Sequence, residues 1–178
     1  RLGFPTAESG IRAHLTHVAQ TFLTGYNLGL QHEDTEQLGA ALVAAVSKAD
    51  QGFAFEGAAM ATSILDTLVP GPGTRFQRLF EYAGSTHAYM LHVGAGWAVA
   101  RLPFRVQDRL LSADPLLRWL RVDGYGFHEG FFHGRDYLER GRRPPLSGYA
   151  ARAFDQGLGR SLWFFHGAAP DAIAGVIA

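Results

Sequence analysis

The stretch HEGFFH, from His128 to His133, combines residue types that could do chemistry more densely than any other part of the chain. Histidine and glutamate are common zinc ligands, and the zinc-protease motif places two histidines four residues apart on one face of a helix. Here they are five apart, about 500° of helical rotation, so we expect them to point away from each other. Glu129 and His133 can share a face, but the Glu-x-x-His pair of di-iron bundles has a spacing of three. A metal would therefore need ligands from distant segments, and we predict none.

Two glutamates lie alone in strongly apolar surroundings, Glu56 in FAFEGAAMA and Glu129 in FHEGFF. A buried carboxyl must be paired, or loss of hydration raises its pKa. A carboxyl with a raised pKa can donate or accept a proton near neutral pH. Glu56 and Glu129 are therefore the candidate catalytic residues, with His92 and His128 as candidates beside them. The alternative is a structural ion pair with one of three arginines, Arg101, Arg152 or Arg160.

Glu129 carries the sharper expectation of the two. Its phenylalanine neighbours predict that the carboxyl is buried, held by an arginine or by a backbone amide from another helix. His128 is turned by about 100° around the helix and is not expected to be its partner. If Glu129 instead faces a cavity together with Glu56, it becomes the leading functional carboxylate.

The elements that must position these residues are helical. The segment ESGIRAHLTHVAQTFLTGYNLGL places apolar residues on one face at steps of three and four, and similar spacing recurs almost throughout, including 106–113. Asp34 followed by Gln37 predicts a capped helix start, and the PGPG run at 70–73 predicts a break. Strand-like alternation is scarce, although the 86–100 segment fits a helix least well. We predict an all-α domain over residues 1–178, a glycine-rich bundle of several helices with a break near Gly124.

Glycines within these helices indicate close contacts between helices. Gly25 and Gly29 are four apart, as are Gly126 and Gly130, so each pair forms a smooth groove that favours tight packing over a ligand pocket. We expect five aromatic residues around such contacts to be buried: Trp97, Phe127, Phe131, Trp163 and Phe164. The similarity of GFAFEGAAM at 52–60 to GYGFHEGFF at 124–132 indicates an internal helical duplication. Pro170 and Asp171 look like the opening of a helix, so we expect a piece of a longer protein.

Composition excludes several classes of protein. The 178 residues carry 16 basic and 16 acidic side chains, which argues against nucleic-acid binding. Cysteine is absent, which excludes disulfides and thiolate metal sites and fits a reducing cytoplasm. No signal peptide or membrane-spanning segment is visible, so we expect a soluble cytoplasmic protein. The basic run at 135–145 is interpreted as a solvated linker. VGAGWAV has Val99 where a dinucleotide fingerprint needs its third glycine, so the cofactor remains unknown.

The longer runs resemble a known bacterial family. DPLLRWLRVDGYGFHEGFFH, LSGYAARAFDQGLGRSLWF, GFAFEGAAMA and HVGAGWAVARLP are similar to the UnbL-type proteins, which are encoded beside enediyne polyketide synthases. The resemblance covers nearly everything from Gly25 onward. It implies participation in building the enediyne core from a linear polyene, and it implies no chemical step, cofactor or catalytic residue.

Two hypotheses follow from the residues and the resemblance together. The protein is either an enzyme acting on a long apolar polyene or polyyne intermediate, or a non-catalytic carrier or scaffold. The carrier would shield the intermediate and dock other proteins of the enediyne pathway. The two differ in whether the glutamates meet in one accessible cavity or lie apart in ion pairs.

Overall fold

The computed structural model describes residues 9–102 and 114–177, and every regular element within these ranges is a helix. The elements are α1 (Ser9–Gln31), α2 (Thr35–Ala45), α3 (Gln51–Leu68), α4 (Arg75–Val99), α6 (Arg118–Gly134), the π-helical η2 (Arg135–Glu139), α7 (Gly148–Phe165) and α8 (Pro170–Ile177). The all-α prediction is confirmed, and the 86–100 segment belongs to α4. The helix predicted over 106–113 lies outside the described residues.

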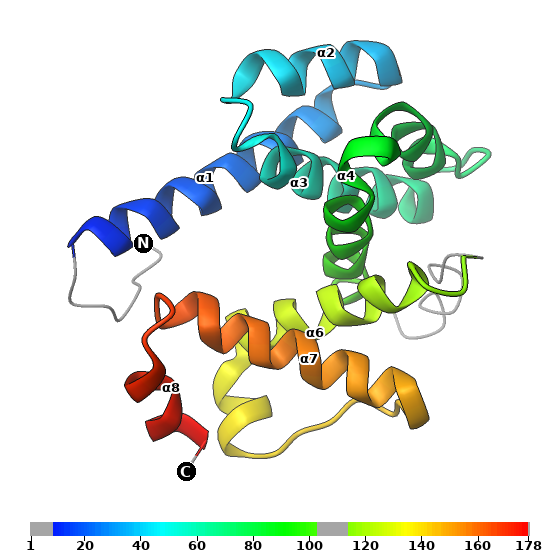
Figure 1. The fold of residues 1–178 in the computed structure, drawn as a ribbon. Helices are drawn as coiled ribbons and strands as arrows, with labels where there is room; N and C mark the ends of the chain where they lie inside the picture. Colours follow the sequence, from blue (N-terminus) through cyan, green and yellow to red (C-terminus); the bar gives the residue numbers. More distant parts are fainter. Residues whose placement is uncertain (1–8, 103–113, 178) are drawn as a thin grey trace.

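The long helices pack in chain order. α1 contacts α3, α3 contacts α4, α4 contacts α6, and α6 contacts α7, whereas α2 packs mainly on α4 and α1. Figure 1 shows α1, α2 and α3 on one side and α6 and α7 on the other, with α4 connecting the two groups. None of the described helices combines the length and the apolar character that a membrane crossing would require.

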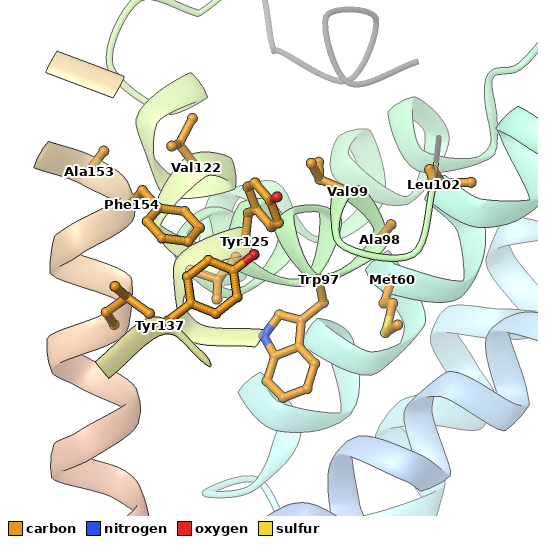
Figure 2. Close-up of a cluster of buried hydrophobic side chains, with 12 residues drawn as sticks. Met60, Trp97, Ala98, Val99, Leu102, Val122, Tyr125, Tyr137, Ala153 and Phe154 are labelled. Carbon is orange, nitrogen blue, oxygen red and sulfur yellow. The ribbon is translucent and has the colours of Figure 1, made fainter. Parts of the chain in front are cut away.

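Two clusters of buried apolar side chains correspond to these two groups. One joins α2, α3 and α4 through residues such as Leu42, Phe55 and Leu79. The other joins the end of α4 to α6, η2 and α7, and Figure 2 shows Trp97 and Tyr137 within it. Because α4 contributes to both clusters, it fixes the position of one group of helices relative to the other.

Glycines make the helix crossings. The α-carbon of Gly25 lies against the carbonyl of Ala54, and that of Gly57 lies against the carbonyl of Phe22, so a Cβ at either place would overlap a carbonyl oxygen. Such approach brings Cα–H groups onto carbonyl oxygens and brings the two helices unusually close. The preference for tight packing at Gly25 is thus confirmed.

The same reciprocal contact recurs along the chain. Gly96 and Gly124 form it between α4 and α6, and Gly126 and Gly157 form it between α6 and α7. In each case the glycine follows, by three residues, the carbonyl that its partner contacts. At the α3–α4 crossing Gly94 meets the carbonyl of Glu56, and the reciprocal position, 56 + 3, holds alanine.

The crossings define the register of a structural repeat. Gly57 of α3 and Gly124 of α6 both pack on the preceding long helix, which makes α3 and α6 equivalent with an offset of 67 residues (124 − 57). Glu56 then corresponds to Asp123 (56 + 67). This register differs from the one suggested by sequence similarity, which aligned Gly52 with Gly124, because aromatic neighbours rather than crossing glycines dominated that comparison.

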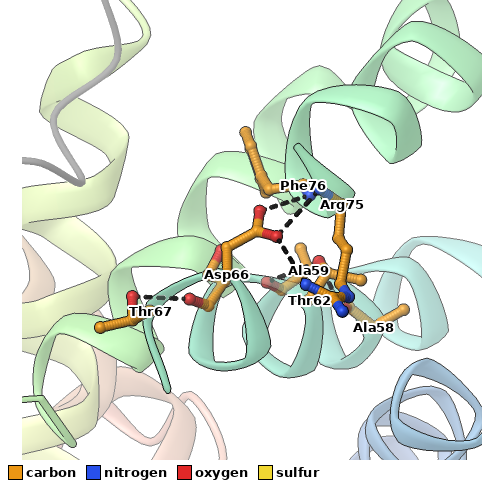
Figure 3. Close-up of polar contacts among 8 residues, drawn as sticks. Ala58, Ala59, Thr62, Asp66, Thr67, Arg75 and Phe76 are labelled. Atoms are coloured by element: carbon orange, nitrogen blue, oxygen red, sulfur yellow. Dashed lines mark hydrogen bonds and ion pairs between the residues drawn. The ribbon is translucent and has the colours of Figure 1, made fainter. Parts of the chain in front are cut away.

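Two aspartate carboxylates accept hydrogen bonds from backbone N–H groups in the first turns of helices. Asp34 accepts a hydrogen bond from the backbone N–H of Gln37 at 2.8 Å, as predicted. Asp66, near the end of α3, accepts the N–H groups of Arg75 and Phe76 at 2.9 Å each, across the predicted break at 70–73 (Figure 3). Because Thr74 makes no side-chain cap, Asp66 supplies the acceptors that the first turn of α4 lacks.

The end of α6 departs from the prediction. The helix is continuous through Gly124, where a break was expected, and is kinked at His133, whose φ and ψ are −128° and 29°. The following segment is not simply a solvated linker, because 135–139 forms the π-helical η2 and Tyr137 is only 3% exposed. The kink lies four residues after Glu129 in the chain.

Candidate functional site

A cavity of about 420 Å³ lies among α1, α3, α4, α6 and α7. Apolar and aromatic side chains make up nearly all of its wall, namely Val18, Ala19, Phe22, Leu23, Phe53, Met90, Trp97, Phe127, Phe131, Phe132 and Phe164. Two neighbouring hollows share parts of this wall, one through Phe22, Trp97 and Phe132 and the other through Phe127 and Phe164. Shared residues therefore connect the three into one largely apolar region, which Arg101 and His128 also border.

Of the described residues that line the cavity, two are charged, Glu56 and Arg160. Glu56 projects from α3 beside its crossing with α4 and is 8% exposed. Burial raises the pKa of the Glu56 carboxyl to about 8, the positive charge of Arg160 opposes the rise, and the negative charge of Asp123 adds to it. Glu56 makes no ion pair within the described residues, so its carboxyl is mostly protonated at neutral pH.

Trp97 is the polar neighbour of Glu56 across the cavity wall. Its indole opposes the rise of the Glu56 pKa. The Nε1–H nevertheless makes no hydrogen bond of normal geometry to any described group, although it is buried. A buried carboxylic acid and a buried N–H donor without a full partner therefore face the same apolar space.

Arg160 is already paired. Its Nε donates to Oδ2 of Asp123 at 3.2 Å, and its Nη2 forms a short contact with Oδ1. Burial alone would lower the pKa of Arg160. The hydrogen bonds that Arg160 donates to Asp123, together with the negative charge of Asp123, outweigh burial and raise the pKa. The guanidinium also lies 5.0 Å from the ring centre of Phe127. The cavity thus holds one neutral ion pair and one protonated acid.

These two pairs are equivalent in the repeat. α4 and α7 correspond with an offset of 63 residues, since Gly94 and Gly157 pack in the same way on the helix before them (157 − 94). Trp97 then corresponds to Arg160 (97 + 63), just as Glu56 corresponds to Asp123. One copy combines a carboxyl with an indole and the other combines a carboxyl with a guanidinium.

Glu129 lies in a separate cluster. It is 6% exposed, which confirms its predicted burial. Among the described residues, two histidines and not an arginine or a backbone amide from another helix hold it, so that prediction is wrong there. Nδ1 of His128 lies 3.1 Å from Oε1, and Nδ1 of His133 lies 3.2 Å from Oε2. Glu129 and His133 are four residues apart, so the helix places both on one face, and the helix is kinked at His133 itself.

Burial alone would raise the pKa of Glu129. Contacts with His128 and Tyr137 outweigh that effect, so the pKa lies below its usual value. Glu129 and Glu56 do not meet in one cavity, because Glu129 lines none of the three hollows. The expectation that the histidines point away from each other is also wrong, since they contact the same carboxylate.

The two candidate histidines have different surroundings. His128 borders the hollow beside Trp97 and Arg101. His92 lies in the core, 2.9 Å from the carbonyl oxygen of Ala88 through Nδ1, with its ring against those of Phe76 and Phe80. Since His92 lines none of the three hollows, the structure does not bring it to the other candidates.

The aromatic residues expected in the core have a different role. Trp97 is buried as predicted, but Phe127, Phe131 and Phe164 are half-buried because they line the cavity. Trp163 is 53% exposed, so its predicted burial is wrong. Asp123 was not predicted as part of the site, and only the repeat of an acid before a crossing glycine could have indicated it.

Comparison with known proteins gives the family. A family described as "Protein of unknown function (DUF1702)" matches the chain over residues 1–178. The chain belongs to the DUF1702 family. No curated protein and no solved structure matches it. For this DUF1702 protein, the chemistry of the cavity is therefore the observation on which a function has to rest.

Proposed function

We propose that this DUF1702 protein binds a long, uncharged, apolar chain in the cavity between its two groups of helices. In the pathway that the resemblance to UnbL-type proteins implies, this chain is a polyene or polyyne intermediate of enediyne core formation. The observation that carries the proposal is a largely aromatic cavity in which, among the described residues, the one ionisable group outside an ion pair, Glu56, is protonated at neutral pH.

The shape of the wall supports a flat conjugated ligand. Phe127 and Phe131 are stacked with an interplanar angle of 14°, and Trp97 lies 5.5 Å from the Phe127 ring. Such faces can contact the π system of a polyene along its length. The cavity volume falls within the range of about 300–1,000 Å³ typical of small-molecule sites.

The charges support an uncharged ligand. Asp123 neutralises Arg160, so the guanidinium is not available to bind a fatty carboxylate without losing its partner. Glu56 would repel an anion once ionised and offers one O–H donor while protonated. The cavity is therefore better suited to a hydrocarbon chain than to a fatty acid.

Glu56 separates the catalytic form of the proposal from the carrier form. A buried carboxylic acid with a pKa of about 8 can act as a general acid or base on a bound intermediate near neutral pH. If the protein is an enzyme, Glu56→Gln in an enediyne producer abolishes core formation at normal protein abundance. If the protein is a carrier or scaffold, the same variant supports core formation as the wild type does.

Binding is tested with diphenylhexatriene, an uncharged linear polyene whose fluorescence rises in apolar surroundings. We expect saturable binding at one site per chain. Ala19→Phe, which places a ring in the cavity, weakens binding at least tenfold. Ala13→Phe is the matched control, because residue 13 is exposed on the same helix and lines none of the three hollows. Equal binding by both variants, or no saturable binding at all, contradicts the proposal.

A further inference from the structure

A histidine–carboxylate cluster at the end of α6 has no part in the proposed function. It comprises His128, Glu129 and His133, whose ligand atoms all lie within 4.8 Å of one another. The two nitrogen–oxygen distances are 3.1 and 3.2 Å. Atoms bound to one tetrahedral zinc ion at about 2.0–2.1 Å are roughly 3.3 Å apart. Each nitrogen–oxygen distance, one to Oε1 and the other to Oε2 of Glu129, is compatible with a shared metal ion as well as with a hydrogen bond.

The backbone departs from a regular helix at His133, the last residue of this cluster. In an undistorted helix, residues 128 and 133 would be separated by about 140° around the axis. Glu129 lies between them, about 100° from His128 and about 40° from His133 around the axis, so its carboxylate can reach both. The helix is kinked at His133 and continues as the π-helical η2. π-Helical insertions of this kind are frequent at functional sites.

The Nε2 side of the His128 ring provides a second, independent observation. The residue is 0% exposed, and its Nε2 has no hydrogen-bond partner in the described part of the chain. Its ring lies perpendicular to Trp97 at 5.5 Å and 4.8 Å from Phe132. An N–H is favourable beside the π electrons of such rings, whereas a lone pair is not. With its proton on Nε2, His128 presents an N–H rather than a lone pair to these buried aromatic surroundings.

That tautomer leaves a lone pair on Nδ1, directed at the carboxylate of Glu129. Two acceptors at 3.1 Å repel each other unless a cation lies between them. A proton can occupy this place in two ways, because it either leaves Nε2 as a lone pair among the aromatic rings or makes His128 a fully buried imidazolium. A metal ion at Nδ1 satisfies both ends of His128 at once.

We propose that Nδ1 of His128, a carboxylate oxygen of Glu129 and Nδ1 of His133 bind a divalent transition-metal ion. Two imidazoles and one carboxylate are a donor set for Zn²⁺ or Fe²⁺, and three protein ligands leave a coordination position open. The His133 side chain is 45% exposed, so water or a small ligand can reach the cluster. Tyr137 forms a hydrogen bond with Glu129 and would help to orient the carboxylate.

The test is calorimetric titration of protein without a histidine tag, with Zn²⁺ in one series and with Fe²⁺ under anaerobic conditions in another. We expect one ion per chain in at least one series, and the tighter series identifies the ion. Glu129→Gln and His133→Ala each weaken that binding at least tenfold. Co²⁺ as a stand-in should give the intense visible bands of low-coordinate cobalt, not the weak bands of the hydrated ion.

Two controls keep the result decisive. His17→Ala removes another exposed histidine, which lies 3.1 Å from the carboxylate of Asp50. The described residues form no three-ligand group there, so this variant should leave the affinity unchanged. His133→Ala should melt as the wild type does without metal, because its ring is half exposed. Absence of micromolar binding in both series overturns the site, and so does binding that His133→Ala leaves unaltered. The outcome does not depend on whether the cavity binds a polyene.

Discussion

Glu56 and Asp123 occupy equivalent positions at two successive helix crossings, each one residue before a glycine that packs on the preceding long helix. Only Asp123 has a cation bound to it, because the position that holds Arg160 in one copy holds Trp97 in the other. The difference leaves one acid ionised in a pair and the other protonated in an apolar wall. Because Trp97 stands where the other copy has an arginine, Glu56 is the one ionisable group without an ion pair among the described residues that line the cavity.

Glu56→Gln should flatten the dependence of stability on pH. Below pH 4.5 the Glu56 carboxyl is protonated in the native and in the unfolded protein, so its ionisation does not lower the free energy of unfolding. Between pH 4.5 and about 8 the unfolded chain ionises while the native state does not, so the wild type loses stability as pH rises. Relative to Glu56→Gln, the loss should reach about 5 kcal/mol above pH 8.

The measurement is urea unfolding of both proteins at several pH values. Comparing the two cancels the histidines, whose titration affects both equally. Glu81→Gln, at an exposed position on α4, is the control and should follow the wild type. A constant difference between the wild type and Glu56→Gln from pH 5 to pH 8.5 would contradict the raised pKa.

Gly157→Ala and Gly159→Ala should have opposite effects on stability. A Cβ at position 157 would overlap the carbonyl oxygen of Asp123, so the helices must separate at a cost of about 1–3 kcal/mol or more. At position 159 a Cβ meets nothing within 4 Å, and alanine should stabilise α7 by up to about 1 kcal/mol. Thermal unfolding measures both. A tolerated Gly157→Ala would disprove the close crossing.

Arg160→Ala should destabilise the protein by about 3 kcal/mol, because it leaves the carboxylate of Asp123, 1% exposed, without its partner. Arg152→Ala, an exposed arginine on the same helix, is the matched control and should change stability by less than about 0.5 kcal/mol. Adding Asp123→Asn to Arg160→Ala should recover part of the loss. If the double variant is no more stable than Arg160→Ala, the buried charge is not the cause.

Much of the fold follows from local patterns. The steps of three and four predicted the helices, Asp34 predicted a helix start, and the glycines of α1 and α6 predicted close packing, since each depends on neighbours in sequence. The kink at His133 did not follow, because a π-helical turn depends on what the helix packs against. The pairing of Asp123 with Arg160, 37 residues apart, also depends on the tertiary fold. Sequence therefore identified Glu56 as a candidate but could not tell its state from that of Asp123.

The most direct test of the central claim is an experimental structure of the protein with an uncharged linear polyene bound. We expect the chain to lie along Phe127, Phe131 and Trp97, with Glu56 in its wall and the Asp123–Arg160 pair intact. A polyene found outside the cavity, or a cavity still empty at saturating polyene, would contradict the account.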